Sequence, residues 1–367
     1  MSKKNIDIKI VEYKEFDDSY NNYLVLSFKG NNINYVIMNT LRRTIMELIP
    51  TYAFDKKDIN ITSNTTIYNN DYMKLRLSQL PIFGIDNNID TLDRIFELEN
   101  EANISTFEQQ IEDINIIEEK EQKQKLEKAM NFTMYISVKN TTTSILNLTT
   151  DNENIKFYYK GKPIESPYKD KILIIKLKPG EEFKCTAISS LNIGLKSANY
   201  MPNSVCIFTE IEDEYRLNLE SLKQLTEKEI IIRACMIVNK KLDNFKKILI
   251  NKISEYKSDK YTDNFNIDNT TDISIKSSDE DFIEQHRITG IITIENESHT
   301  YGNLLSKLLQ DHNSITFAGY KINHLLIKEL TIAYKTDGTD ILDILDDIIN
   351  IGKNIFNEIK TKIDKLL

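Results

Sequence analysis

Residues 32–55 read NINYVIMNTLRRTIMELIPTYAFD and combine a helical apolar pattern with a pair of arginines. The apolar residues recur every three or four positions and so form one stripe along an α-helix, which comprises Ile33, Val36, Ile37, Leu41, Ile45 and Leu48. We expect Asn31 or Asn32 to cap the start and Pro50 to end the helix. On periodicity alone, the stripe indicates an ordinary core helix packed against another helix.

The arginine pair lies in a motif with a known counterpart. The segment Asn39-Thr40-Leu41-Arg42-Arg43-Thr44, with residues 49–55 after it, resembles the motif of the α-like subunits of cellular DNA-dependent RNA polymerases. These are the third-largest eukaryotic subunit, the archaeal D subunit and the amino-terminal domain of bacterial α. The resemblance implies that the helix docks an α-like pair onto the large catalytic subunits through Asn39, Arg42, Arg43 and Thr44. Residues 76–82 continue the pattern, with Ser78 where the family usually has glycine.

A second motif lies near the other end of the chain. Residues 297–305, ESHTYGNLL, followed by residues 317–321, FAGYK, and His324, resemble the small α-like partner, which is the archaeal L or eleventh eukaryotic subunit. Tyr301 replaces the usual leucine, and Leu325 replaces the usual proline. The resemblance implies that the two halves pair through Ile37, Leu41, Ile45, Leu48, His299, Thr300, Gly302, Asn303, Leu304, Leu308, Phe317, Gly319, Tyr320 and His324.

Two long helices are expected beyond these motifs. Thr226 and Glu229 fit a capping box before a stripe of about seven turns, which comprises Ile231, Ala234, Cys235, Val238, Leu242, Phe245, Leu249 and Ile253. A helix of that length with one apolar face needs a partner helix. Near the C-terminus we expect Thr300 to cap one helix and Thr339 to cap a last one. The stripe of the last helix is Ile341, Leu345, Ile348, Gly352, Ile355, Ile359, Ile363 and Leu366.

The order of elements predicts an α+β fold with two α-like dimerisation domains that pair in one chain. The first, D-like domain is discontinuous, at residues 1–55 and 189–256, and a β-rich domain at 56–188 interrupts it. Residues 257–285 are polar and predict a linker, and residues 286–367 form the L-like domain. Inside the insertion we expect strands at 132–138, 155–159, 172–177 and 183–188, the last two paired as a hairpin through Pro179-Gly180. The charged run at 118–128 indicates a solvated helix or a mobile excursion.

Composition limits the function classes. A formal charge of -9 argues against a surface made to wrap nucleic acid. Cys185, Cys206 and Cys235 have no C-x-x-C spacing, so we expect buried thiols in a reducing compartment, without a zinc site, a disulfide or a cofactor. The zinc loop or iron–sulfur cluster of some relatives is excluded for lack of cysteines. No apolar run reaches the length of a membrane helix, which predicts an intracellular, soluble protein.

The two resemblances together imply a fused pair of α-like subunits, acting as a non-catalytic assembly platform of an RNA polymerase. The expected partners are the largest and second-largest subunits and small subunits of the tenth and twelfth type, with DNA reached only through the complex and no membrane contact. Such fusions occur in large cytoplasmic DNA viruses, which implies a location in host cytoplasm and virion. Two alternatives remain open: an enzyme with His299 as base near Asp311 or Glu297, and a free-standing dimerising transcription factor or adaptor, which would need a basic face.

Overall fold

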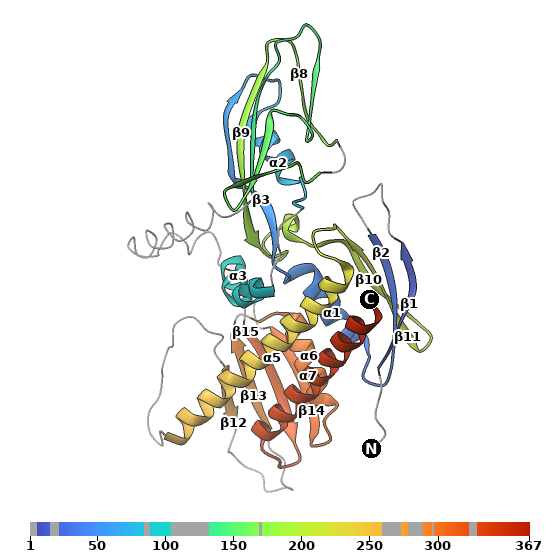
Figure 1. Cartoon of the computed structure of the whole chain (residues 1–367). Coiled ribbons are helices and arrows are strands. Elements are labelled where there is room, and N and C mark those ends of the chain that lie inside the picture. The colour runs from blue at the N-terminus through green and yellow to red at the C-terminus, as the bar shows by residue number, and fades with distance from the viewer. Residues whose placement is uncertain are drawn as a thin grey trace. The chain divides into compact units, whose positions relative to one another are not determined.

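The computed structural model describes residues 6–14, 22–83, 89–103, 132–168, 171–258, 273–277, 289–295, 297–322 and 329–367. The chain divides into two compact units (Figure 1). Unit 1 comprises Met1–Met46, Val205–Glu220 and Glu227–Leu367, and unit 2 comprises Glu47–Ser204 and Ser221–Thr226. The charged run at 118–128 lies outside the described residues.

Unit 1 is built from two similar sets of elements. The first half has the order β1 (Asp7–Lys14), β2 (Asn22–Lys29), α1 (Tyr35–Glu47), β10 (Asn203–Ile211), β11 (Glu214–Ser221) and α5 (Glu227–Ser258). The second half has the order β12 (Ile273–Ser277), β13 (Thr289–Glu295), α6 (His299–Gln310), β14 (Ile315–Ile322), β15 (Glu329–Thr336) and α7 (Ile341–Leu366). Their sheets run β1-β2-β11-β10 and β12-β13-β15-β14, so the strands occupy corresponding places. The second half therefore repeats the first, as the sequence indicates.

Strand β12 lies inside the segment that the sequence predicts as a linker. It pairs antiparallel with β13, with Ile273 opposite Ile294 and Ser277 opposite Gly290. The linker prediction is therefore wrong for residues 273–277. The alternation of isoleucine with polar residues in this short stretch is a strand pattern that the polar surroundings obscure.

The helix starts differ from the predicted caps by one to three residues. Asn34 caps α1, because its Oδ1 accepts from the N–H groups of Val36 and Ile37 at 3.0 Å each. Ser298, and not Thr300, precedes α6, and Asp340, and not Thr339, caps α7 by accepting from Leu342 N–H at 3.0 Å. Short polar residues adjoin one another at each helix start, and periodicity does not choose between them.

The other end of α1 also differs from the prediction. The helix stops at Glu47, before Leu48 and Pro50. Leu48 therefore lies in the turn after α1, and the last residue of the predicted stripe is not part of the helix. Because proline restricts the residue before it as well as its own backbone, the helical conformation is lost ahead of Pro50.

Unit 2 holds a five-stranded sheet and a two-stranded sheet. The larger has the order β3-β9-β4-β6-β7, with β3 (Thr51–Asn64), β9 (Glu182–Asn192), β4 (Thr133–Lys139), β6 (Ile155–Tyr159) and β7 (Lys162–Ile164). The smaller pairs β5 (Leu146–Thr149) with β8 (Leu173–Leu177). The remaining elements are α2 (Asn70–Ser78), η1 (Ile89–Arg94), α3 (Ile95–Asn103) and η3 (Ala198–Tyr200). Phe54, Phe132, Phe157 and Phe183 are buried in the core between these elements.

The predicted hairpin of β8 with β9 is wrong. The turn itself forms, with Gly180 at φ 84° and Glu181 N–H donating to Lys178 C=O at 3.0 Å. The two strands, however, belong to different sheets. The buried side-chain amide of Asn140 connects the loop before β5 with the end of β8. It donates to the carbonyls of Ser144 and Leu177, at 2.8 Å each. A Pro-Gly turn reverses the chain but does not determine which sheet the next strand enters.

Candidate assembly interface

Helix α1 carries the arginine motif. Ile37, Leu41 and Ile45 are at most 2% exposed and form its inner face. Thr44, which the resemblance assigns to contacts with the large subunits, is 3% exposed and also faces the core. Asn39, Arg42 and Arg43 are half-buried. The surface of α1 that a partner can reach therefore includes the flank with these three polar side chains, and Tyr35 at the helix start is 56% exposed.

Arg42 is held in place by its own helix. Its Nε and Nη2 donate to Asn39 Oδ1 at 3.2 and 3.0 Å, and its Nη1 donates to Met46 Sδ at 3.3 Å. Within the described residues, no carboxylate bonds to Arg42. A guanidinium has five N–H groups, so two remain for another acceptor. The side chain is positioned for a contact that the described part of the chain does not supply.

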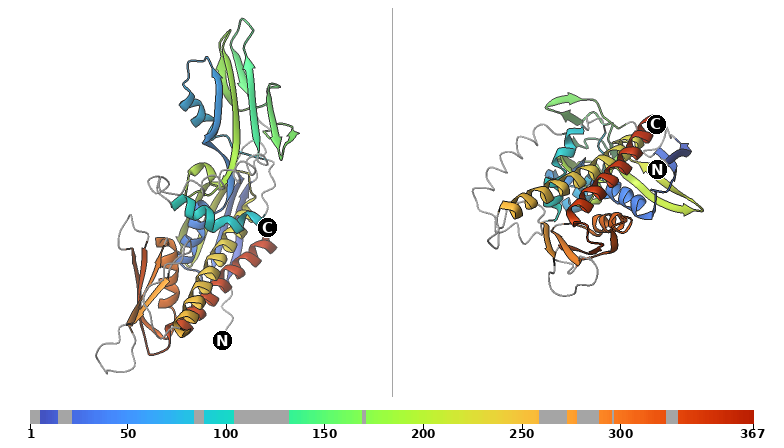
Figure 2. Two further views of the ribbon diagram at one scale, coloured as in Figure 1. Left: turned by 90° about the vertical axis from the view of Figure 1, so that its left-hand side faces the viewer. Right: turned by 90° about the horizontal axis from the view of Figure 1, so that it is seen from below.

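Helices α5 and α7 join the two halves of unit 1. They lie side by side in both views of Figure 2. Asn239 Nδ2 donates to Asn357 Oδ1 at 2.8 Å, Lys246 Nζ lies 2.5 Å from Asp346 Oδ1, and Lys353 pairs with Asp243. The sequence predicts that α5 needs a partner helix, and α7 is that partner, with its stripe buried from Ile341 to Ile363.

The N-terminal strand is also tied to α7. Ile6 is fully buried, and its N–H donates to Glu358 Oε1 at 3.0 Å. Lys362 Nζ donates to the carbonyl of Ile6. These bonds join the start of the first half to the last helix of the second half.

The second motif forms α6 and β14. Gly302 is buried, and a Cβ built on it would lie 2.4 Å from Leu330 Cδ1 and 2.8 Å from Tyr320 Cδ2, so a larger residue would force these side chains to move. Leu304 is fully buried, and Leu308 packs against α7 at Gly352. The glycine thus brings the backbone of α6 close to the sheet of its own half.

The other predicted pairing residues have less buried positions. Thr300, Asn303, Gly319 and Tyr320 are half-buried, and burial raises the pKa of Tyr320, with the nearby Tyr35 of α1 adding to the shift. Phe317 is 58% exposed on the edge strand β14, so it is not buried between the halves. His324 lies outside the described residues.

His299 shows no catalytic arrangement within the described residues. It is exposed, and its ring meets that of Tyr320 at 5.9 Å between centroids. Asp311, a carboxylate considered as its partner, accepts from Lys307 at 2.7 Å, and Glu297, the other, pairs with Lys241 at 3.0 Å. His299 therefore contributes an aromatic contact between α6 and β14.

Lys241 and Glu297 are the interface residues that sequence reasoning missed. Lys241 lies on α5 in the first half and Glu297 precedes α6 in the second, and their side chains are only 6% and 9% exposed. Lys241 Nζ also lies 5.3 Å from the ring centroid of Tyr301, which in turn meets Phe245 at 6.4 Å. One signal was available, because Lys241 falls at a helical spacing within the apolar stripe, between Val238 and Phe245.

The three cysteines are free and buried, as the sequence predicts. Burial raises the pKa of Cys185, Cys206 and Cys235 to about 12, and the charge of Arg42 opposes the shift at Cys206. Among the described residues, no group of three or more His, Cys, Asp or Glu side chains is placed to hold a metal ion. None of the helices in the described part of the chain is long and apolar enough to span a bilayer.

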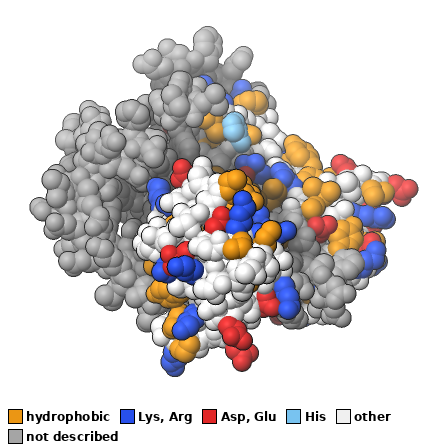
Figure 3. Space-filling model, turned by 90° about the horizontal axis from the view of Figure 1, so that it is seen from above, with side chains coloured by type: hydrophobic (Ala, Val, Ile, Leu, Met, Phe, Trp, Pro, Cys, Tyr) orange, Lys and Arg blue, Asp and Glu red, His pale blue; other side chains and the backbone are white. Residues whose placement is uncertain are grey.

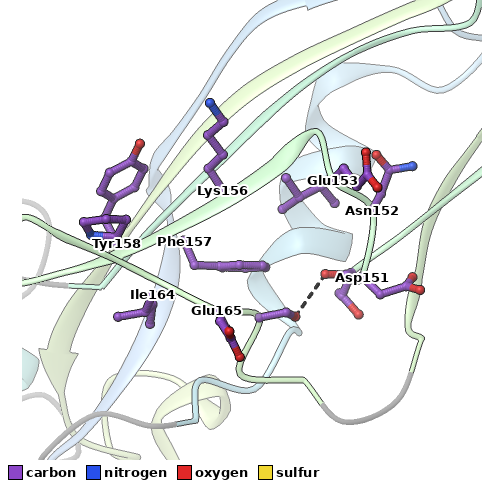
Figure 4. Close-up of a pocket in the computed structure, with 12 residues that line it drawn as sticks. Asp151, Asn152, Glu153, Lys156, Phe157, Tyr158, Ile164 and Glu165 are labelled. Carbon is purple, nitrogen blue, oxygen red and sulfur yellow. Dashed lines mark hydrogen bonds between the residues drawn. The ribbon is translucent and has the colours of Figure 1, made fainter.

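Unit 2 has a shallow hollow of about 280 Å³ beside β6 and β7. Figure 4 shows Phe157 in the middle of it and the carboxylates of Asp151, Glu153 and Glu165 around it. Its lining contains no histidine or cysteine. Among the described residues on the face drawn in Figure 3, Lys and Arg side chains are scattered among acidic, apolar and other side chains. Neither feature resembles a catalytic centre or a nucleic-acid groove.

Comparison with known families identifies both halves. The profile described as "RNA polymerase Rpb3/Rpb11 dimerisation domain" matches residues 27–242, which is more than half of the chain. The chain belongs to the RNA polymerase Rpb3/Rpb11 dimerisation domain family. A second profile with the same description matches residues 289–362, so the chain carries two such domains. The first match begins before α1 and extends across the whole of unit 2 into α5.

Individual relatives agree with this family. A protein of Acanthamoeba polyphaga mimivirus that is named as a DNA-directed RNA polymerase subunit is 27% identical over 375 residues, covering 99% of this chain and 95% of the relative. The RNA polymerase RPB3-11 homolog of African swine fever virus is 31% identical over 87 residues, 23% of this chain and 24% of the viral protein. The Rpo11 subunit of Metallosphaera sedula is 29% identical over 94 residues, 24% of this chain and 97% of the archaeal one.

Proposed function

We propose that this chain is an assembly subunit of a DNA-dependent RNA polymerase, in which a fused α-like pair forms the platform for the two large catalytic subunits. The observation that carries the proposal is the presence of two Rpb3/Rpb11 dimerisation domains in one chain, whose long helices α5 and α7 lie against each other. The second-largest subunit docks first and the largest follows, and the complex reaches DNA. The chain itself performs no chemistry.

The flank of α1 is the proposed contact with the large subunits. Asn39 positions Arg42, and the two N–H groups left on Arg42 suit a carboxylate or a pair of carbonyl groups on the partner. Lysine is a poor substitute because it lacks the planar fork. Thr44 is left out of this contact because it is buried.

A domain assignment accompanies the proposal. We assign residues 56–188 to an insertion within the first dimerisation domain and residues 286–367 to the second domain. The extent of the first family match, which runs continuously across unit 2, supports an insertion. Small subunits of the tenth and twelfth type complete the platform. The two viral relatives support a role for this chain in a viral polymerase, which we place in the host cytoplasm and the virion.

The test uses the tagged full-length chain expressed together with its large polymerase subunits. We expect Arg42→Ala with Arg43→Ala to fold, as judged by circular dichroism and an unchanged unfolding midpoint, but to lose co-purification of the large subunits. Arg42→Lys should retain only part of that binding. A control is Lys56→Ala with Lys57→Ala, which also removes two adjacent cations, in this case exposed ones. Normal co-purification with the double arginine variant would refute the proposed contact.

A separate measurement tests the absence of catalysis. The purified chain alone should show no hydrolytic or nucleotidyl-transfer activity above background. Activity that disappears in His299→Ala would favour the enzyme alternative and contradict the proposal.

A further inference from the structure

The contacts between α5 and α7 obey a two-fold relationship. Ile341 lies 114 residues after Glu227, so the two helices begin at equivalent places. Lys353 lies 114 residues after Asn239, and Asn357 lies 114 residues after Asp243. A two-fold rotation that exchanges the two helices therefore converts the contact of Asn239 with Asn357 into that of Lys353 with Asp243. Positions 227–252 of α5 each have a counterpart on α7 that lies 114 residues further along the chain.

A second equivalence relates α1 to α6. Asn34 precedes α1 and Ser298 precedes α6, and these positions are 264 residues apart. The same separation aligns Asn39 with Asn303 and superposes the apolar spacing of the two helices. By these two rules the counterpart of Lys241 is Ile355, and the counterpart of Glu297 is Ile33.

The counterparts differ in chemistry from the pair that they mirror. Lys241 and Glu297 form a buried ion pair with 3.0 Å between Nζ and Oε2. Ile33 and Ile355 are likewise buried, at 7% and 6% exposure, but they are apolar. One of the two equivalent positions thus holds opposite charges, and the residues that the two offsets assign to the other are both isoleucines.

This asymmetry distinguishes the possible pairings. Where the first half meets the second half, Lys241 meets Glu297. The two offsets assign Ile33 and Ile355 to the mirrored site. If two second halves paired, each Glu297 would face an isoleucine, and if two first halves paired, each Lys241 would. An unpaired buried charge is strongly unfavourable, whereas an apolar pair alone would accept every combination.

We propose that the Lys241–Glu297 pair is a specificity determinant, which selects pairing between a first and a second half and rejects pairing of like halves from two copies of this chain. The ring of Tyr301 lies against the lysine, with Lys241 Nζ 5.3 Å from its centroid. A buried ion pair adds little stability compared with an apolar pair of the same volume, so its value lies in discrimination. The inference rests on unit 1 alone and is independent of the polymerase role proposed above.

The first test is charge reversal in the full-length chain, followed by urea unfolding. We expect Lys241→Glu and Glu297→Lys each to lower the unfolding midpoint, because each places like charges together in a buried site. The double reversal should recover most of the loss. The matched control reverses Lys246 and Asp346, which form an ion pair between α5 and α7 but are 33% and 49% exposed. Its single variants should change the midpoint little.

The second test measures which halves associate. Two differently tagged full-length chains, one carrying Lys241→Glu and the other Glu297→Lys, are expressed together. Each variant repels its own second half but complements that of the other chain, so the two should co-purify in equal amounts and show the summed mass by native mass spectrometry. Two wild-type chains should not. The proposal is overturned if the double reversal fails to recover the midpoint. It is also overturned if both single variants unfold at the wild-type midpoint and remain separate.

Discussion

Gly352 of α7 lies directly against Leu242 of α5, so that a Cβ built on the glycine would be only 3.2 Å from Leu242 Cδ1. The same Cβ would be 3.1 Å from Leu308 Cδ1 on α6. Three helices therefore meet at a residue without a side chain. The glycine is what allows α7 to approach both neighbours.

We expect Gly352→Val to destabilise the chain by about 1–3 kcal/mol, because two extra methyl groups would overfill this contact. Gly352→Ala should cost less, since a gain of about 1 kcal/mol in helix propensity offsets the tight contact. Urea unfolding of the full-length chain measures both. The control is Ile351→Val, which changes the exposed neighbouring position and should have little effect.

Replacement of Tyr301 tests the packing between the halves. Tyr301→Leu removes the ring that contacts Lys241 and Phe245, and we expect a loss of about 1–3 kcal/mol of unfolding free energy. Tyr301→Phe keeps both ring contacts and should lose clearly less. Equal stability of the leucine variant and the wild type, in thermal or urea unfolding, would contradict the role assigned to the ring.

Asn140 is expected to be a stability determinant of unit 2. Its side chain is fully buried and donates to two carbonyls, while its Oδ1 accepts from Thr142 N–H at 2.9 Å and from Thr142 Oγ1–H at 2.7 Å. Asn140→Ala should therefore cost about 2 kcal/mol, since the buried Leu177 carbonyl loses its side-chain donor and the loop at Thr142 and Ser144 loses three further bonds. Asn154→Ala provides the control, because Asn154 is exposed and its side chain bonds only to Asn152. Hydrogen exchange of β5 and β8 locates the effect.

The cysteines should be unreactive in the folded chain. Burial raises the pKa of all three thiols from 9.0 to about 12, which lowers the thiolate population at pH 8 about a thousandfold. Iodoacetamide should add to none of them in the native chain and to all three in urea, as counted by intact mass. Rapid native labelling at any one of them would contradict this expectation.

The raised pKa values of the three thiols also make the unfolding free energy depend on pH. A raised folded pKa means that the folded state favours the protonated thiol, so this contribution is complete below about pH 9 and is lost as the pH rises toward 12. Unfolding free energy should fall over that alkaline range. Cys235→Ala should reduce the slope of that fall, measured against the wild type in the same buffers.

Much of the fold could be predicted from apolar spacing. Val238, Leu242 and Phe245 on α5 are buried as their periodicity indicates, and so are Ile348 and Ile359 on α7. Apolar spacing predicts the buried residues here because each helix has one solvent-exposed face and one buried face. Leu366 is the exception, at 36% exposure, because it lies in the last turn beyond the end of the packed region.

The parts that could not be predicted depend on partners far away in the chain. Periodicity shows that α5 needs another helix but not that α7 supplies it, and the turn at Gly180 shows a reversal but not that β8 and β9 enter different sheets. Lys241 is one of several lysines in its helix, and only its place within the stripe distinguishes it. A single sequence cannot reveal that its counterion stands 56 positions later.

The hydrogen bonds of Ile6 with Glu358 and Lys362 have a consequence for folding during translation. At about 5–20 residues per second, the ribosome needs many seconds between releasing the first strand and releasing the helix that holds it. During that time, the apolar face of α5 is not yet packed against α7. A nascent chain with such an exposed face binds chaperones or associates with other nascent chains. A translation product that stops before residue 341 would keep that exposed face permanently and become a substrate for quality-control proteases.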